Sequence, residues 1–518
     1  MQSVSQAWKD VQEQYLVPES YIEITMNVGD PDAQSSATSS DNGHVDYSDS
    51  SSLVEAEGND PVLYATLEHN MWMLNGTFQI IPDKEPYGDN GYISDVIASD
   101  DGSFFTYPMI TISFDSVFSA LIPGVTITWS ETYGEYASSF RVTAYNGQTQ
   151  VAQSTIQDNE NIVSVVYMDI ENYDRITIEV LEWNIPERRA RVERVLVGIE
   201  KKYTKTDLLA FENTLSVDLL SAELPVAEIS FQISNLNGEY NPENPQGFAI
   251  YLMERQRVTV RYGYNINGQK EWIPAGTYYM SEWQTPQNGI TATFSARDAQ
   301  EYMTDLYTGI SSGTLMEIAT AAFQQAGLPE MDDGTNRWIV DSSLSGITVP
   351  ADVDLSERTI GEVLQFVANA ACCVFYQDRS GVVHIQPFSG TSTDYEINKF
   401  NSYENSEISL TKQLKSVDIN NGQYVLNVGT VGETQNVSNP LISDERAPTV
   451  AQWVASVLQN RRILSGQFRA DPRLDPLDYV TNINQFSTSD VIITQIQYVY
   501  NGAFRGNYEG RNIPLGGE

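Results

Sequence analysis

The sequence is short of the residues on which most metal sites and covalent cross-links depend. Its 518 residues include two cysteines and three histidines. Cys372 and Cys373 are adjacent at the end of an apolar helical pattern, which excludes a disulfide framework and is typical of buried thiols. His44, His69 and His384 lie far apart, without the short spacing of zinc ligands. We therefore expect no metal site.

Basic residues are also scarce. The chain has 29 Lys and Arg against 69 Asp and Glu, a net charge of −40. Binding of nucleic acid through its phosphates requires a basic surface, so this composition argues against it. The excess acid has two interpretations: the wall of a conduit that DNA passes without sticking, or solubility, as in a salt-adapted secreted protein. The hydrophobic fraction of 41% is that of a folded protein.

Long apolar runs and catalytic constellations are missing as well. There is no apolar run of about 18 residues and no signal-peptide pattern, so we expect a protein made in the cytoplasm without a membrane span. The motifs HExxH, GxGxxG and the Walker loop are absent. A GxSxG sequence occurs once, at 309–313, but the three scattered histidines offer little from which to build a Ser-His-Asp triad. Carboxylate pairs arise by chance among 69 acidic residues, so they do not identify a glycosidase. We expect neither an enzyme nor a cofactor.

The patterns that are present predict a mainly β, multidomain protein. Residues 1–60 hold a short helix, a half-buried strand at 21–28 and an acidic, Ser-rich stretch at 30–60 that we interpret as a linker. Residues 61–203 contain short strands separated by Gly and Asn-Gly turns, which predicts an antiparallel β-sandwich.

Three regions follow the sandwich. Alternating strands occupy 204–299, two amphipathic helices and a hairpin occupy 300–400, and strands with one helix occupy 401–518. The strand at 21–28 has no partner in its own neighbourhood, so we assign it to the 204–299 region. The sandwich at 61–203 is then an insertion.

Several segments resemble phrases that recur, in the same order, in bacteriophage tail-hub proteins. They are residues 226–242, 276–283 and 294–298, the hairpin phrase YxDxxGxxxI at 376–385, and FRADPRLDPLDYV at 468–480. The last follows a helix expected at 450–464 and contains a strand at 468–470 and the turn residues Pro472, Leu474 and Asp478. Leu477 stands where the family has Gly, so we expect this turn to close without a left-handed residue there.

The resemblance implies a fold and a role. The fold is two tail-hub β-barrels, at 204–299 and 401–518, a small α/β domain between them and the inserted sandwich. The role is structural: a homotrimeric ring in the virion tail, assembled in the host bacterial cytoplasm. Its partners would be distal-tail or tube proteins, the tape-measure protein and tip or fibre proteins. DNA would pass without specific binding through a channel whose acidic wall includes Glu404, Glu407, Asp471, Asp475 and Asp478.

The sandwich resembles the galactose-binding-like jelly roll, which implies a host glycan as a ligand. Sugars stack on aromatic rings and bind polar groups through their hydroxyls. The candidate residues are Trp129, Tyr133, Tyr136, Arg141 and Trp183, with Asp89 and Asn90 as further polar groups. The alternative is that these aromatics fill the core or a subunit contact.

Two other features and two other functions remain open. The acidic loop at 83–90 offers oxygen ligands for Ca²⁺ without EF-hand spacing. The basic run at 188–205 is either a docking surface or a solvated edge. A surface protein that binds carbohydrate through the sandwich is the alternative function, disfavoured by the lack of a signal peptide. A tail-associated hydrolase is a third, disfavoured by the lack of a catalytic constellation.

Overall fold

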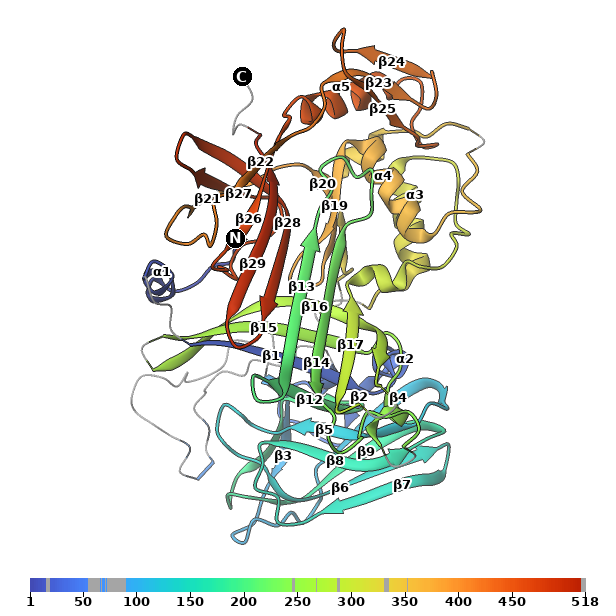
Figure 1. Cartoon of the computed structure of the whole chain (residues 1–518). Coiled ribbons are helices and arrows are strands. Elements are labelled where there is room, and N and C mark those ends of the chain that lie inside the picture. The colour runs from blue at the N-terminus through green and yellow to red at the C-terminus, as the bar shows by residue number, and fades with distance from the viewer. Residues whose placement is uncertain are drawn as a thin grey trace.

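The computed structural model of the chain describes residues 1–14, 19–54, 90–244, 247–266, 268–286, 289–329, 335–351 and 353–513, with the single positions 66, 68, 69 and 71. Strands dominate it and the helices are short (Figure 1). The mainly β, multidomain class predicted from the sequence is confirmed. No helix in these ranges is long and apolar enough to cross a membrane.

A 13-stranded sheet forms the body of the molecule. Its first lobe contains, in spatial order, β12 (Ile199–Thr204), β1 (Ser20–Val28), β15 (Arg257–Ile266), β16 (Gln269–Gln284), β17 (Thr291–Arg297), β14 (Val226–Ser234) and β13 (Leu208–Ser216). Its second lobe contains β28 (Thr488–Tyr500), β29 (Phe504–Arg511), β26 (Arg462–Phe468) and β22 (Glu407–Leu410), with β27 (Asp478–Ile483) and β21 (Thr391–Ile397) branching from β28.

Strands assigned to both barrels belong to this one sheet. Strand β13 pairs antiparallel with β28, and a single hydrophobic cluster runs through both lobes. Among the strands that the structure describes, neither lobe closes into a separate barrel, because the strand order passes from one lobe into the other.

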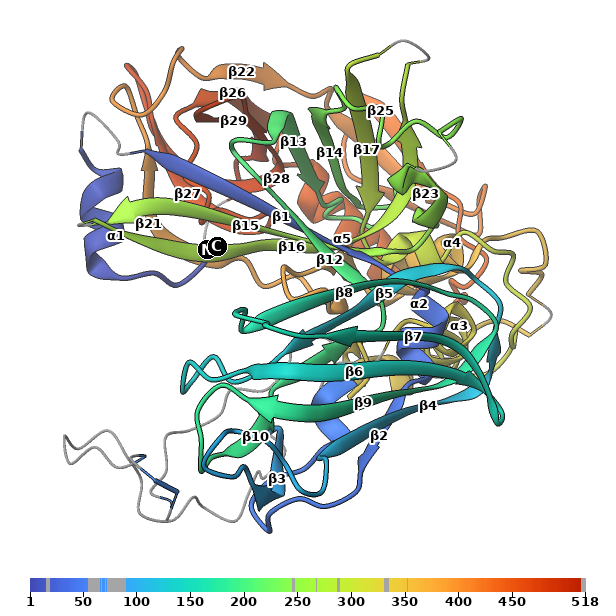
Figure 2. The same ribbon diagram turned by 90° about the horizontal axis from the view of Figure 1, so that it is seen from below.

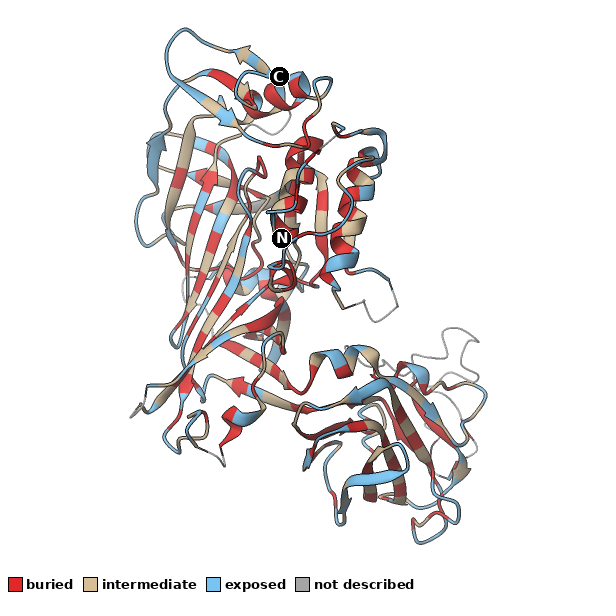
Figure 3. Ribbon diagram, turned by 90° about the vertical axis from the view of Figure 1, so that its right-hand side faces the viewer, coloured by how far each residue is buried: buried red, intermediate tan, exposed pale blue. Residues whose placement is uncertain are grey.

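Alternating polarity explains why these residues form strands. In β1, Ile22, Ile24 and Met26 are buried, whereas Glu23 and Thr25 between them are not. Successive side chains of a strand point to opposite faces, so the apolar set faces the core. Figure 3 shows the same alternation along the other long strands. Burial of apolar area, at about 25 cal/mol per Å², is the main stabilising contribution of such a core.

The chain leaves the sheet to form the sandwich and returns to the sheet at the same place. The chain departs at Val28 and returns at Ile199, and these two residues are paired in the antiparallel ladder of β1 and β12. Strand β1 also pairs with β15, as expected if it belongs to the first lobe. Gly29 packs closely at this crossing, where a Cβ would lie 2.3 Å from the Val197 carbonyl oxygen. Chain ends this close are the geometry that a domain insertion requires.

The inserted domain has its own core and lies below the first lobe (Figures 1 and 2). Its five-stranded sheet consists of β2 (Thr38–Asp41), β4 (Met109–Phe118), β9 (Tyr173–Trp183), β6 (Ala137–Asn146) and β7 (Thr149–Ile156). The other sheets are β11 (Arg194–Leu196) with β5 (Ile122–Thr128) and β8 (Val163–Ile170), and β10 (Arg189–Val192) with β3 (Tyr92–Ile97).

The stretch interpreted as a linker belongs in part to this domain. Residues 30–54 supply β2 and two short helices, α2 (Pro31–Ser36) and η1 (Ser51–Val54). Ala33 and Leu53 are fully buried in the sandwich core. Few apolar residues are enough here because the rest of the sandwich provides the surface against which they pack.

The small domain contains the two helices predicted between the β regions, α3 (Leu315–Ala326) and α4 (Ile360–Ala371). Each begins with a capping box, as in Thr314 with Glu317, and each is followed by a left-handed residue, Gly327 or Cys372. Beside them lies a sheet of β18 (Trp338–Val340), β20 (Val383–Pro387) and β19 (Cys373–Gln377).

This domain extends past residue 400. Its hydrophobic cluster also takes residues from β23 (Leu414–Ile419) and α5 (Ala447–Leu458), with β24 (Tyr424–Asn427) and β25 (Glu433–Val437) beside them. The helix predicted over 450–464 ends at Leu458, and the residues predicted as its last turn begin β26. Strand β26 pairs with β29 on one edge and β22 on the other, and this pairing outweighs local helical propensity.

Candidate functional site

Residues 469–478, here called the junction segment, connect β26 to β27 where both lobes and the small domain meet. Arg469 donates a hydrogen bond to the main-chain oxygen of Gln14, just beyond helix α1 (Gln6–Gln12), at 2.7 Å. The buried hydroxyl of Tyr498 in β28 donates to the carbonyl oxygen of Leu474 at 2.7 Å. The segment is therefore held from two sides.

A buried ion pair lies within the junction segment. Arg473 Nε is 2.9 and 3.0 Å from the two carboxylate oxygens of Asp471, and Arg473 Nη2 is 2.5 Å from one of them. Burial alone would lower the pKa of Arg473, but the hydrogen bonds and charge of Asp471 raise it above its ordinary value. The pair is compensated only as long as both residues are present.

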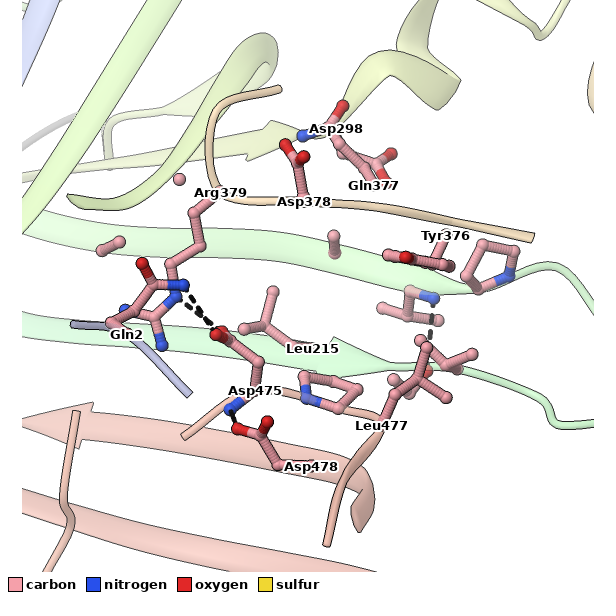
Figure 4. Close-up of a pocket in the computed structure, with 18 of the residues that line it drawn as sticks. Gln2, Leu215, Asp298, Tyr376, Gln377, Asp378, Arg379, Asp475, Leu477 and Asp478 are labelled. Atoms are coloured by element: carbon pink, nitrogen blue, oxygen red, sulfur yellow. Dashed lines mark hydrogen bonds and ion pairs between the residues drawn. The ribbon is translucent and has the colours of Figure 1, made fainter. Parts of the chain in front are cut away.

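Arg379 reaches the junction segment from the turn between β19 and β20 of the small domain. Its Nε lies 2.6 Å from Asp475 Oδ1, and its Nη2 donates to the Leu474 carbonyl oxygen at 2.9 Å. Its Nη1 donates at 2.8 Å to the carbonyl oxygen of Pro274 in β16. Burial acts to lower the pKa of Arg379, but the charge of Asp475 outweighs it and raises that pKa. One planar guanidinium thus links the small domain to both lobes (Figure 4).

A cavity of about 200 Å³ lies beside this link. Four carboxyl groups from different parts of the chain surround it, those of Asp298, Asp378, Asp475 and Asp478 (Figure 4). Asp298 is buried and caps the short helix η4 (Ala299–Tyr302) by accepting a hydrogen bond from the Gln300 backbone nitrogen at 3.0 Å. Burial raises the pKa of Asp298 to about 6.

The raised pKa of Asp298 predicts a pH-dependent contribution to stability. The pKa rises from 3.8 to about 6 on folding, so the contribution is fully present below pH 3.8 and is lost as the pH rises through about 6. Relative to Asp298→Asn, the wild-type free energy of unfolding should fall by about 2 kcal/mol from pH 4 to 7. Urea unfolding across this range measures the difference, with exposed Asp305→Asn as the control. A difference that does not change with pH would contradict the prediction.

Leu477 adopts a left-handed conformation, with φ of 74°. The expectation that this turn closes without such a residue is wrong. The Leu477 nitrogen donates to the Ile493 carbonyl oxygen at 2.8 Å, and the Asp478 nitrogen donates to that of Asp475 at 3.2 Å. These bonds impose a conformation that costs a Leu residue about 1–2 kcal/mol.

This strain predicts an unusual order of stability. Leu477→Gly and Leu477→Ala both lose the side chain, but only Gly adopts positive φ without cost, so the Gly variant should be more stable by about 1 kcal/mol. At exposed Gln452 within α5 the order should be reversed by about 1 kcal/mol, because Gly disfavours a helix interior. Chemical denaturation of the four variants provides the measurement. If Leu477→Ala proved as stable as Leu477→Gly, the strain would be refuted.

Two of the three acidic residues of the junction segment are buried and so cannot line a channel as expected. They are Asp471 and Asp478. Asp471 pairs with Arg473, and Asp478 accepts a hydrogen bond from the Asp475 nitrogen at 2.8 Å, which draws both carboxylates into the protein. Asp475 is partly exposed and is bound by Arg379.

Two of the five candidate sugar-binding residues lie in the sandwich core. Trp129 and Trp183 are buried with their ring centroids 6.0 Å apart in an edge-to-face arrangement. Their faces are therefore closed to a sugar. Asn90 donates to the Tyr47 carbonyl oxygen at 3.0 Å. Asp89 and the rest of the acidic loop at 83–89 lie outside the described residues.

The other three candidates lie nearer the surface. Arg191 lies over the ring of Tyr133, 5.0 Å from its centroid. Tyr136 is partly buried and packs against the sandwich core. Arg141 forms an ion pair of 3.0 Å with Glu179. The structure thus brings no two of these residues together around a common pocket among those described.

Beneath Tyr133 the sandwich buries a cluster of charges. Glu135 accepts a hydrogen bond from Trp183 Nε1 at 3.0 Å and pairs with Arg191 at 3.5 Å and Arg188 at 3.6 Å. Arg191 Nη2 also lies 2.5 Å from Glu68 Oε2. Burial acts to raise the pKa of Glu68, but Arg191 lowers it overall. Part of the basic run at 188–205 is therefore internal rather than a surface.

The described part of the chain contains no group of three or more His, Cys, Asp or Glu placed to hold a metal ion. Cys372 and Cys373 are free thiols, and burial raises the pKa of Cys373 to about 12. His384 lies 2.8 Å from Asp378 and stacks on Tyr376, which ties the ends of one hairpin together. These residues stabilise local structure.

Sequence reasoning located the junction segment but missed Arg379. This residue lies within the hairpin phrase at 376–385, where its position in the turn does not distinguish it from an ordinary polar turn residue. Asp475 follows it 96 positions later, too far for any local pattern to connect the two. Correlated changes of the two positions among related chains would be the signal that reveals such a pair.

Comparison with known proteins gives no matching family model and no matching curated protein. Among solved structures the chain is similar to the 43 kDa tail protein of prophage MuSo2 from Shewanella oneidensis, with 16% identity and a TM-score of 0.41 over 60% of this chain and 93% of that one. It is similar to the tail protein from Neisseria meningitidis MC58, with 11% identity and a TM-score of 0.41 over 61% of this chain and 94% of that one.

A third similar structure is the E. coli c3393 protein, described as a type VI secretion component with structural similarity to the bacteriophage T4 tail proteins gp27 and gp5. It has 10% identity and a TM-score of 0.38 over 60% of this chain and 74% of that one. Phage tail proteins, the class that the sequence resembles, thus recur among these solved structures.

Proposed function

We propose that this protein is a structural subunit of a phage or prophage tail, located at the hub between the tail tube and the tip. The observation that carries the proposal is the convergence of the hub-like segments on one place. The segments 226–242, 276–283, 294–298, 376–385 and 468–480 are far apart in the sequence, yet each contributes residues to the cavity of the junction.

This convergence supports an assembly role. The residues that resemble the family are those that fix the two lobes and the small domain relative to one another, by buried ion pairs and main-chain hydrogen bonds. A subunit that binds other subunits at fixed positions needs domains that are rigidly placed relative to one another. This role requires no substrate or cofactor. We therefore propose a role without catalysis.

In the proposed assembly, identical copies form a homotrimeric ring through head-to-tail contacts. Such contacts close into a ring when the rotation from one copy to the next brings the last copy back to the first. The ring would join distal-tail or tube proteins to tip or fibre proteins and surround a channel for the tape-measure protein and DNA. A chain of net charge −40 offers phosphates little attraction, so DNA would pass without specific binding. The protein would be located in the virion tail and assembled in the host cytoplasm.

The copy number in assembled tails tests this proposal. Cryo-electron microscopy of tails that carry the tagged full chain should locate it at the tip end of the tube, as a trimeric ring. A ring with two-fold symmetry or with six copies, or a position along the tube, would refute the proposal. The mass of the purified chain in solution, measured beside negative-stain images, is the companion experiment.

A further inference from the structure

One face of the first lobe has the opposite charge to the chain as a whole. It is the outward face of β12, β1, β15 and β16 with their flanking residues, here called the basic face. Its basic side chains are Arg194, Lys202, Lys205, Arg257, Arg261 and Lys270, and its acidic ones are Glu19, Glu23 and Glu200. Six positive and three negative charges leave +3 on this face of a protein whose net charge is −40.

Three of the six basic side chains are held in place by two aromatic rings. Lys205 and Lys270 both lie over Tyr21, 4.9 and 4.5 Å from the ring centroid. Arg261 lies 4.6 Å from the centroid of Trp272, and Tyr21 and Trp272 are themselves 6.4 Å apart. Cation–π contacts of this kind hold the charges at defined positions.

A groove runs along the basic face. Its volume is about 780 Å³, and its lining includes Arg194, Arg257, Arg261 and Trp272. Thr25, Asn27 and Thr259 add polar groups on the strands between them, and Glu200, Asp378 and Arg379 also line the groove. A groove of this chemistry suits an extended segment that presents carboxylates and some apolar surface.

Strand β22, at the other end of the strand order, is such a segment. Among the described strands it pairs only with β26, and its four residues are all exposed. Leu410 is 65% exposed and Ile408 42% exposed. Glu404 and Glu407 are exposed beside them, and residues 401–410 include no Lys, Arg or Pro. An open edge with apolar side chains and without these protecting residues is a template for pairing with another chain.

We propose that strand β22 of one copy of this chain docks on the basic face of the next copy. The inference rests on the proposed function, which provides identical copies in a ring. The two surfaces are complementary in charge, and they belong to different lobes of the same chain. Their contact is therefore heterologous, and it repeats around the ring until the ring closes.

This contact also removes positive charge from the path of DNA. A basic face open to the channel would hold phosphates and slow their passage. Covering that face with Glu404 and Glu407 lowers its charge from +3 to +1. The inference assigns these two residues to a subunit contact instead of the channel wall expected from the sequence.

A charge swap in the full chain tests the contact. Glu407→Arg and Arg261→Glu should each weaken self-association by about tenfold or more at low salt, and the double variant should recover most of it. Sedimentation velocity over a range of concentrations measures the association. Exposed Asp115→Arg in the sandwich changes charge equally and should leave association unaltered. Near-ultraviolet circular dichroism should match the wild type for all four variants.

Three results would overturn the inference. The first is a wild-type chain that stays monomeric at about 100 µM and low salt, where a specific interface should associate. The second is that Glu407→Arg and Arg261→Glu each associate like the wild type. Single variants whose ring stays intact and whose tails only eject DNA more slowly would count in the same way. The third is binding of short duplex DNA that Arg261→Glu abolishes, which would assign the basic face to nucleic acid.

The outcomes for this contact and for the proposed function are separable. Tails with a trimeric hub ring that still assemble from both single variants would leave the proposed function standing and refute only the contact. Tails in which the chain has another copy number would refute the proposed function, whatever the charge swap shows.

Discussion

Replacing Arg379 by methionine is expected to lower the free energy of unfolding by about 3–5 kcal/mol. The guanidinium is 7% exposed and is bound by Asp475 and by the carbonyl oxygens of Pro274 and Leu474. Methionine fills similar space but donates no hydrogen bond. The Asp475 carboxylate then loses its charged partner and is left with the Gln2 amide at 2.8 Å, and the Leu474 carbonyl oxygen is left with the Tyr498 hydroxyl. Urea unfolding followed by far-ultraviolet circular dichroism measures the loss.

Two further variants make this result specific. Arg358→Met breaks an exposed ion pair of 3.4 Å with Glu362 and should cost about 0.5 kcal/mol or less. Adding Asp475→Asn to Arg379→Met removes the uncompensated charge and should restore part of the lost stability. If Arg379→Met behaved like Arg358→Met, the junction would not hold the lobes and the small domain together.

Replacing Arg191 by methionine should destabilise the sandwich by about 3–5 kcal/mol while leaving the 13-stranded sheet folded. Arg191 is 3% exposed and lies between Glu68 and Glu135 inside the sandwich. Without it, Glu135 keeps the Trp183 indole and the more distant Arg188, and Glu68 keeps the Arg189 backbone nitrogen, but both buried carboxylates lose their shared guanidinium. The effect should be confined to one domain because the sandwich has a separate core and joins the sheet at one point.

Differential scanning calorimetry with limited proteolysis distinguishes the two domains. In Arg191→Met the unfolding transition of the sandwich should move to a lower temperature. Protease cleavage sites should appear within 90–197 before they appear in the 13-stranded sheet. Arg141→Met removes the partly exposed pair with Glu179 on the same domain and should shift the transition little. A single transition that moves as a whole would show that the sandwich is not an independent insertion.

The two arginine variants probe places that the sequence identified only in part. The segment at 468–480 is conspicuous because two X-Pro steps interrupt a strand-like pattern, and the structure shows it at the centre of the molecule. Its partner Arg379 could not be predicted, because contacts between residues so far apart depend on how whole domains dock. The burial of Asp471 and Asp478 could not be predicted for the same reason. A carboxylate is expected at the surface unless the residue that compensates its charge is known.

Local signals predicted local structure well. Helices α3 and α4 carry capping boxes and an apolar face, so each end is specified within a few residues. The strand at 21–28 was predicted from its alternation, because burial on one face leaves a period of two in the sequence. Where local and tertiary preferences conflict, the tertiary contacts prevail. Residues 462–464 are strand instead of helix, and Leu477 takes a conformation that its side chain disfavours.

By itself the sequence determined the class of this protein: mainly β and strongly acidic, with segments that resemble phage tail hubs and without the spacing of a metal or catalytic site. Those properties follow from composition and from patterns a few residues long, because burial on one face and the capping of a helix leave local signatures. Only the tertiary structure decided that strands of both predicted barrels form one sheet, that residues 414–458 join the small domain, and that five distant segments meet at the cavity beside Arg379. Such contacts depend on surfaces that exist only after each lobe has folded.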